Sequence, residues 1–456
     1  MSDIEELRKE MEQITTNMLK LLKSRTDIAK EIGHLKNKQG LTVTDESRED
    51  ELRSKMMLVC DKMGFDQSLA TRFLNFLLNE SVKVQSSESQ THLTIFLKAK
   101  ELEREGKKII HLEVGEPDFR PPETVRDSLS EIYDAGFGKY GPVKGIPEFR
   151  DSIAMFANKH FDCKVNSENV MVVPGARFGV FLTFSTLLNY GDEVIIIEPA
   201  WPAYRQCAIN AGVKIRSIKT TLEDNWEPTL EQIKSSINNN TKMIVLNYPN
   251  NPTGKILPKG LQDSIIDISK DNNLYILSDE IYSNYANENW KSVLSYNYDK
   301  SIITQSFSKS HSMTGYRIGY VISSNEIIEK MSQLQSLCIT NVSEPIQYVA
   351  MNSINDDVSQ NGKVIRERLS TLSEIAQNMD LEFEIPEGAM YIFARTKDKI
   401  NTSEFAEKLL DYGLAIAPGN AFGDYKNFFR ISACIEKEKI MQGMDILKAM
   451  LNDMHG

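Results

Sequence analysis

The chain has 456 residues, of which 41% are hydrophobic and 26% charged, a balance typical of a folded protein with more than one domain. A formal net charge of -11 argues against a surface that binds nucleic acid or acidic lipid. The five cysteines have no CxxC spacing, and no apolar run approaches the roughly 18 residues of a membrane span. We therefore expect a cytoplasmic protein without a zinc site, a disulfide framework or a membrane anchor.

The first forty residues are predicted to form one long helix. Apolar residues recur three and four positions apart from Ile4 to Leu35, the spacing of a seam that packs against other helices. Arg25 falls on that seam, and Lys36, eleven residues later, returns to within ~20° of the same face. Because a buried cation is costly unless an anion meets it, Arg25 is either paired internally or placed for an anionic ligand, and two cations on one interior stripe predict a site for a dianion.

Two shorter helices are expected to follow, with polar groups on their inner faces. The second begins near Asp45, and Asp45, Arg48 and Glu49 are spaced to share one face. Asp66 is placed to cap the third helix, which carries two polar residues one turn apart. Alone, Arg48 and Glu49 would be read as an ordinary surface ion pair. Together, the three polar faces predict a ligand pocket.

Eight polar residues of this region resemble, position for position, the active site of the all-helical chorismate mutases, over about residues 3 to 88. They are Arg8, Arg25, Lys36, Asp45, Arg48, Glu49, Ser81 and Gln85. The resemblance implies an intertwined dimer in which Arg8 reaches the partner's site. It implies that the arginines grip the carboxylates of chorismate, while Lys36 and Gln85 face the ether oxygen as chorismate rearranges to prephenate. Glu49, helped by Asp45, would take the ring hydroxyl.

A polar stretch at residues 85–91 lacks an apolar period and is expected to be a hinge between modules spanning 1–88 and 89–456. Beyond it, short β-rich runs alternate with helical patterns, which predicts an α/β fold. Strands are expected at residues 109–114, 170–173, 194–197, 243–246, 274–277 and 301–305. In α/β folds, ligands bind beyond the carboxyl ends of the strands.

Lys309 follows the last of these strands and lies among hydroxyl groups, with Arg317 eight residues further on. A lysine that forms an imine with an aldehyde cofactor needs an anchor for the cofactor's phosphate. Ser306, Ser308 and Arg317 supply hydrogen-bond donors and charge for one. A lone lysine would indicate only an exposed residue in a serine-rich loop, but this combination predicts pyridoxal phosphate.

Two further strands are followed by candidate cofactor contacts. Gly175, Ala176 and Arg177 open a helix whose free backbone N–H groups suit a phosphate. Trp201 lies in a proline-rich turn, where its indole is placed to stack on a pyridine ring. A glycine at a helix start is weak evidence alone, and a tryptophan is more often a core residue.

The remaining strands carry groups that would tune a pyridine ring and bind a substrate. Asn251 can donate a hydrogen bond to the ring oxygen, and Tyr282 can share that bond. Asp279 would keep the ring nitrogen protonated. Arg430, in an apolar run near the end of the chain, suits a substrate α-carboxylate, although a structural ion pair is the simpler alternative.

In chain order, these residues resemble the aspartate-class, fold-type-I aminotransferases over residues 92 to 456. The resemblance implies an active site at a dimer interface, with Gly115 beside the substrate carboxylate and Tyr140 reaching the neighbouring cofactor's phosphate. Lys309 would hold the cofactor and move a proton as general base and acid. It also implies a large domain at about 131–340 and a small domain at about 92–130 and 341–456.

The substrates are less directly indicated. Arg177 matches a position where some relatives carry a lysine that clamps a second carboxylate, which favours aspartate or glutamate as the amino donor. Because the attached module would make prephenate, we expect a bifunctional enzyme of aromatic amino-acid biosynthesis that transaminates prephenate or aryl pyruvates. Three alternatives stay open. They are a general aspartate aminotransferase whose helical module senses a metabolite or dimerises, a sensor fused to a DNA-binding domain, and a decarboxylase or lyase on the same fold.

Overall fold

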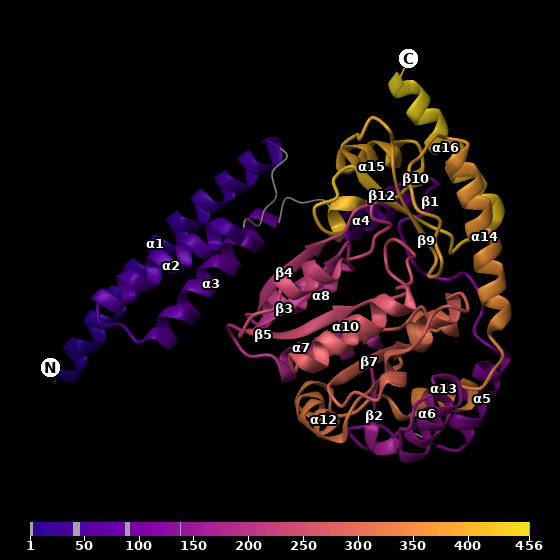
Figure 1. Cartoon of the computed structure of the whole chain (residues 1–456), viewed down its shortest axis with the longest axis horizontal. Helices are drawn as coiled ribbons and strands as arrows, with labels where there is room; N and C mark the ends of the chain where they lie inside the picture. Colours follow the sequence, from indigo (N-terminus) through magenta and orange to yellow (C-terminus); the bar gives the residue numbers. More distant parts are fainter. Residues whose placement is uncertain (1–2, 40–45, 87–91, 137, 456) are drawn as a thin grey trace. The chain divides into compact units, whose positions relative to one another are not determined.

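The computed structural model describes residues 3–39, 46–86, 92–136 and 138–455, and the chain divides into two compact units, Met1–Ser89 and Gln90–Gly456 (Figure 1). The first is all-helical and the second is α/β, so the expected fold class is confirmed for both. Within the described residues, none of the helices combines the length and the apolar character needed to cross a membrane.

The helical unit consists of α1 (Asp3–Gln39), α2 (Glu46–Lys62) and α3 (Gln67–Ser86). Asp66 caps α3 as expected, since its carboxylate accepts a hydrogen bond from the Leu69 backbone N–H at 2.7 Å. Helices α1 and α3 approach closely at Gly33, where a Cβ atom would lie 3.0 Å from the Cα of Gln85.

The apolar seam of α1 is not covered within this unit. Five of its residues are between 52% and 67% exposed, namely Ile4, Leu7, Met11, Ile14 and Met18. The face that packs on α3 is a neighbouring one, on which Ala29 and Gly33 are buried and Arg25 and Lys36 are half-buried. The expectation that the seam is the packed face is therefore wrong for the single chain, because the close approach at Gly33 selects the stripe with small side chains.

The second unit is built on a seven-stranded sheet in the order β2-β8-β7-β6-β5-β3-β4. Its strands are β2 (Val170–Val173), β3 (Glu193–Glu198), β4 (Lys214–Lys219), β5 (Thr241–Leu246), β6 (Tyr275–Asp279), β7 (Ser301–Ser306) and β8 (Gly319–Ile322). Strands β3 to β7 are parallel, whereas β8 runs antiparallel between β2 and β7. Five of the strands lie where the sequence predicts them. The edge strand β4 and the short β8 were missed.

Helices cover both faces of this sheet, and two apolar clusters fill the layers between them. They are α5 (Glu123–Asp134), α6 (Pro147–His160), α7 (Ala176–Leu187), α8 (Pro202–Asn210), α9 (Leu230–Ser235), α10 (Lys259–Asp271), α11 (Phe307–Ser310), α12 (Asn325–Ile339) and α13 (Glu344–Ser353).

A separate core joins both ends of the α/β unit, at the end that carries the C-terminus in Figure 1. It contains α4 (His92–Arg104), α14 (Ser359–Gln377), α15 (Thr402–Asp411) and α16 (Lys437–His455). Its small sheets pair β1 (Ile110–His111) with β10 (Leu414–Ala415), and β12 (Phe428–Ser432) with β9 (Tyr391–Arg395) and β11 (Ala417–Pro418). The strand expected at 109–114 thus has only two residues in a ladder.

Helix α13 falls inside the predicted small-domain range of 341–456, but it packs with the large sheet. Its Val349 and Ala350 are fully buried in the same cluster as Val125 of α5 and Phe149 of α6. The predicted division near residue 340 therefore differs from the packing, because apolar residues of α13 belong to the first core rather than the second.

Candidate active sites

Lys309 lies just beyond the carboxyl end of β7, on the one-turn helix α11. Ser306 caps this turn by accepting a hydrogen bond from the Ser308 backbone N–H at 3.1 Å. The Lys309 Nζ donates to the carbonyl oxygen of Gly115, and no carboxylate of the described residues pairs with it. Burial lowers the pKa of Lys309. This favours the neutral amine, the form that attacks a carbonyl carbon.

Asp279 ends β6, the strand next to β7, and is 1% exposed. Its carboxylate accepts hydrogen bonds from the hydroxyls of Tyr204 (2.6 Å) and Thr304 (3.1 Å). Burial raises the pKa of Asp279, and these hydrogen bonds and the nearby Lys309 oppose the rise. The result is a buried carboxylate of fixed orientation, suited to a cationic ring nitrogen.

Two tyrosine hydroxyls and an amide meet beside this carboxylate. The hydroxyls of Tyr282 and Tyr391 are 2.8 Å apart, and the Asn251 Nδ2 donates to the Tyr282 hydroxyl at 3.5 Å. Burial raises the pKa of Tyr282 well above its ordinary value and that of Tyr391 to about 12. Both phenols therefore keep their protons at neutral pH and can donate to an oxygen. The structure brings Asn251 and Tyr282 together as expected.

Arg430 is 4% exposed and extends from the middle of β12. It donates from Nη1 to the Asn251 side-chain oxygen at 2.7 Å and from Nη2 to the carbonyl oxygen of Glu113. The guanidinium lies 4.2 Å from the ring centroid of Tyr391 and 4.9 Å from that of Phe422. Its Nε is buried without a partner, and no described carboxylate neutralises the charge. A buried cation in this state is suited to an anionic ligand.

A second cationic region lies where α7 begins. Gly175 has φ +84°, and a Cβ atom on it would lie 2.7 Å from Nη2 of Arg317. Only glycine leaves room there for the arginine and for the backbone N–H groups at the start of the helix, where Ala176 is the first residue. The Ser306 hydroxyl donates to that of Ser308 at 2.9 Å on the neighbouring α11. Charge, N–H groups and hydroxyls are thus available for a phosphate.

Trp201 and Arg177 contact each other near this region. The Arg177 guanidinium carbon lies 4.9 Å from the centre of the Trp201 ring, whose edge packs on Tyr204. Burial, followed by the charge of Arg317, lowers the pKa of Arg177. The indole therefore touches Tyr204, whose hydroxyl donates a hydrogen bond to the Asp279 carboxylate. Tyr140, by contrast, is 88% exposed in the single chain.

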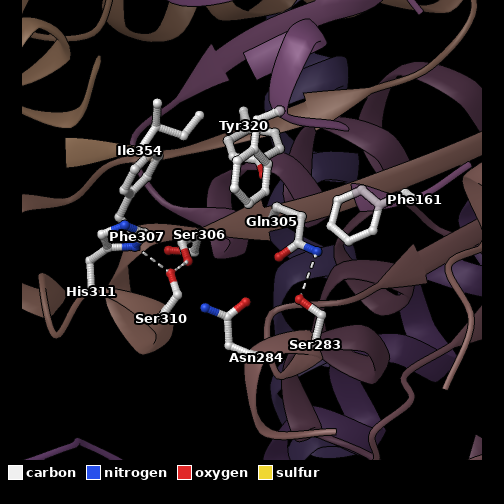
Figure 2. Close-up of a pocket in the computed structure, with 11 residues that line it drawn as sticks. Phe161, Ser283, Asn284, Gln305, Ser306, Phe307, Ser310, His311, Tyr320 and Ile354 are labelled. Carbon is white, nitrogen blue, oxygen red and sulfur yellow. Dashed lines mark hydrogen bonds between the residues drawn. The ribbon is translucent and has the colours of Figure 1, made fainter. Parts of the chain in front are cut away.

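A small pocket borders α11 (Figure 2). Ser310 and His311 line it from α11, and Gln305 and Ser283 face each other across it with a hydrogen bond of 3.1 Å. Lys309 is not among its lining residues. The pocket therefore borders the helix that carries the lysine without belonging to the cationic site.

The helical unit holds part of its expected polar set together. The Arg25 Nη1 donates to the Ser81 hydroxyl (2.5 Å) and to the carbonyl oxygen of Leu77 (2.7 Å). Burial lowers the pKa of Arg25. The side-chain oxygen of Gln85, one turn further along α3, is buried without a partner. With half-buried Lys36 on the same face of α1, these groups form a cationic, donor-rich stripe.

The other expected residues of this set are not gathered there. Arg8 is exposed, and Arg48 is exposed and paired with Glu51 at 2.5 Å. Asp45 and the side chain of Glu49 lie outside the described residues.

Four residues of the larger site were not singled out from the sequence for a role. They are Tyr204, Thr304, Tyr391 and Glu113. Tyr204 follows Trp201 in the same proline-rich turn, and this position was the sequence feature that could have identified it. Tyr391 and Thr304 lie inside apolar strands, and Glu113 contributes a backbone carbonyl that no side-chain pattern reveals.

Comparisons with known families match both units. Residues 7–86 match the family model "Chorismate mutase type II", and residues 107–447 match "Aminotransferase class I and II". An aspartate aminotransferase of Pyrococcus horikoshii is 35% identical over 75% of this chain and 90% of its own length. A probable aspartate/prephenate aminotransferase of Aquifex aeolicus is 32% identical over 79% of this chain and 96% of its own.

Solved structures agree with this assignment. An aspartate aminotransferase from Thermotoga maritima is 32% identical and has a TM-score of 0.77, covering 80% of this chain and 98% of that one. An aromatic aminotransferase from Pyrococcus horikoshii is 30% identical with a TM-score of 0.74, covering 76% and 96%. The chain therefore belongs to the pyridoxal-phosphate-dependent aminotransferases of class I and II, and it joins to that enzyme a chorismate mutase domain of type II.

Proposed function

We propose that the enzyme converts chorismate to prephenate in its helical unit and transaminates prephenate, or an aryl pyruvate derived from it, in its α/β unit. The proposed transamination rests on one observation, the buried guanidinium of Arg430, whose Nε has no partner. Its charge acts on both Lys309 and Tyr282. An anionic substrate held there would have its α-carbon near the one buried amine of the site.

The residues present fit pyridoxal phosphate. Arg317, Gly175 and the start of α7 would hold its phosphate, Asp279 its ring nitrogen, and Asn251 and Tyr282 its ring oxygen. When bound, the cofactor supplies an electron sink for the substrate α-carbon. Lys309 would attach the cofactor through Nζ and afterwards take a proton from the substrate α-carbon and return it.

The choice of substrates rests on the second carboxylate of the ligand. Arg177 and Arg317 act on each other electrostatically at the edge of the site, and Arg177 is exposed enough to reach a ligand. A distal carboxylate placed there would favour aspartate or glutamate as donor and prephenate as acceptor. The relative from Aquifex aeolicus, named for both aspartate and prephenate, supports the same pair.

In the helical unit, Arg25 and Arg8 would grip the carboxylates of chorismate, with Arg48 in support. Lys36 and Gln85 would donate to the ether oxygen as charge develops on it, and Glu49, helped by Asp45, would take the ring hydroxyl. The Gln85 side-chain oxygen is buried without a partner and can accept a hydrogen bond from a ligand, whereas the donation to the ether oxygen would come from its Nε2. The reaction needs no nucleophile, only a fixed conformer and positioned donors.

Both units are proposed to work as homodimers. The exposed seam of α1 would be covered by a second copy of the helical unit, which would also bring Arg8 to the partner's site. Tyr140 would likewise reach the partner's cofactor phosphate. The five free thiols support a reducing, cytoplasmic location.

One experiment tests both halves in the intact protein. Arg25→Ala should abolish prephenate formation from chorismate, while transamination of added prephenate stays within about twofold of wild type because the sites are in separate units. Lys309→Ala should give the reverse result. Chromatography of the products under both conditions reads out both steps.

The same assay decides between substrates. Turnover of oxaloacetate and 2-oxoglutarate, with none of prephenate or aryl pyruvates, would instead establish a general aspartate aminotransferase. The names of several relatives favour that alternative. If chorismate is also left unconverted, the helical unit serves only as a metabolite sensor or dimerisation unit.

A further inference from the structure

One extended segment, Leu112–Gly115, holds both functional cations of the aminotransferase site. The carbonyl oxygen of Glu113 accepts a hydrogen bond from Arg430, and that of Gly115 accepts one from Lys309. The segment is fixed on one side, because the Leu112 backbone N–H donates to Ala415 at 2.9 Å. Any displacement of the peptide at position 113 would therefore move the oxygen that accepts the hydrogen bond from Arg430.

The side chain of Glu113 is buried to 1% exposure and meets one cationic group. Its Oε1 lies 2.8 Å from Nδ1 of His111, whereas its Oε2 is buried without a partner. His111 Nε2 lies 3.2 Å from the carboxylate of Glu103 on α4 but is buried without a hydrogen-bond partner, and Lys100 pairs with the other oxygen of Glu103 at 2.8 Å. The charged groups around the imidazole are thus Glu113, Glu103 and Lys100.

The pKa of His111 is raised, chiefly by its hydrogen bond to Glu113. The imidazolium is therefore favoured over a wider pH range than in water. Removing it would leave the Glu113 carboxylate buried without a counter-charge, a state that a protein avoids by exposing or protonating the group. Exposing the carboxylate would turn the peptide whose carbonyl oxygen holds Arg430.

We propose that His111 is a positioning residue for the substrate carboxylate. Its imidazolium neutralises the Glu113 side chain and so holds the Glu113 backbone in place. The Glu113 carbonyl oxygen in turn holds the Arg430 guanidinium in the geometry that binds the α-carboxylate. The inference rests on the proposed role of Arg430. A contribution to stability alone would have the same contacts, so the test must separate binding of the carboxylate from folding.

The test compares His111→Leu with the double variant His111→Leu/Glu113→Gln in the cofactor-loaded, full-length enzyme. Succinate, a dicarboxylate without an amino group, is titrated by calorimetry, and kcat and KM for aspartate are measured separately. We expect His111→Leu to weaken succinate binding and raise KM about tenfold, with kcat within about threefold of wild type. The double variant removes the orphaned charge and should bring both quantities back to within about threefold of wild type.

Two controls complete the design. His160→Leu alters an exposed histidine of α6 and should leave succinate binding unchanged. Arg430→Ala tests the underlying site on its own. If Arg430→Ala weakens succinate binding but His111→Leu does not, or if the double variant is no better than His111→Leu, the positioning role is wrong. If Arg430→Ala binds succinate normally, the proposed substrate site itself is wrong. If His111→Leu fails to fold while the double variant folds and binds succinate normally, His111 contributes to stability alone and the positioning role is wrong.

Discussion

At the scale of single residues, the proposed substrate site depends on a guanidinium rather than on charge alone. Arg430 uses its two Nη atoms on Asn251 and Glu113, lies over the ring of Tyr391, and has Nε left for a ligand. A lysine could keep the charge, but it could not make these bonds in one plane.

We therefore predict that Arg430→Lys raises KM for both the amino donor and the keto acid by ~10- to 100-fold, because a charge-assisted hydrogen-bond pair with the carboxylate is lost. Steady-state kinetics with aspartate and with prephenate check it. The matched control is Arg395→Lys on the neighbouring β9, whose guanidinium is already paired with Glu223 and Glu382. Equal effects of the two substitutions on KM would contradict the assignment.

Tyr204 gives a second prediction at this scale. Its hydroxyl donates to Asp279 and holds the pKa of that buried carboxyl down against the effect of burial. In Tyr204→Phe the pKa of Asp279 should rise, so the carboxylate is lost at a higher pH as the solution is acidified. The acidic limb of the kcat profile should move to higher pH, while the alkaline limb stays in place.

The control for this prediction is Tyr296→Phe, which removes an equivalent hydroxyl–carboxylate hydrogen bond, to Asp263 at 2.6 Å, outside the site. It should leave the pH profile unchanged. An acidic limb that does not move in Tyr204→Phe would mean that Asp279 is not the group whose ionisation limits the reaction.

At the scale of elements, the position of Lys309 depends on the hydrogen bonds that hold the one-turn helix α11 against its neighbours. His311 closes α11, with Nε2 at 3.0 Å from the carbonyl oxygen of Ser353 on α13. Its Nδ1 lies 2.8 Å from the Ser310 hydroxyl (Figure 2). Burial lowers the pKa of His311 to about 4. The ring is therefore neutral at pH 7, and it links α11 to α13 as a hydrogen-bonded bridge beside the pocket.

Because its folded pKa is depressed below the ordinary 6.5, His311 takes up a proton more readily in the unfolded chain. Stability should thus fall as the pH drops from about 6.5 to about 4, by as much as ~3 kcal/mol from this group. His311→Gln should unfold at a lower temperature than wild type at pH 7, with the difference shrinking towards pH 4.5. Thermal unfolding across that range measures it, with His160→Gln as the exposed control. A difference that does not change with pH would exclude His311 as the titrating group.

The residues that could be predicted are those at the ends of strands. Asn251, Asp279 and Lys309 each follow an apolar run, so their meeting at one sheet edge follows from parallel-strand topology. Tyr391 could not be predicted in the same way, because it comes from a different sheet and meets Tyr282 inside the second core.

At the scale of the whole molecule, the two units have separate cores, and each leaves exposed side chains that support the proposed dimer. In the helical unit the evidence is the α1 seam, whose period was read correctly from the sequence while its burial was not. Sequence periodicity reports that a face is apolar. It does not report whether the same chain or a second copy covers that face.

A charge on the seam tests this last inference. Met18→Glu places a carboxylate on a face proposed to be buried between two copies, where an unpaired charge costs several kcal/mol. We predict that mutase activity is lost at low protein concentration and partly regained as concentration rises, while aminotransferase activity is unchanged. Thr16→Glu, on the exposed polar side of the same helix, should leave both activities intact. Mutase activity in Met18→Glu that matches wild type at every concentration would mean that the helical unit binds and rearranges chorismate as a single copy.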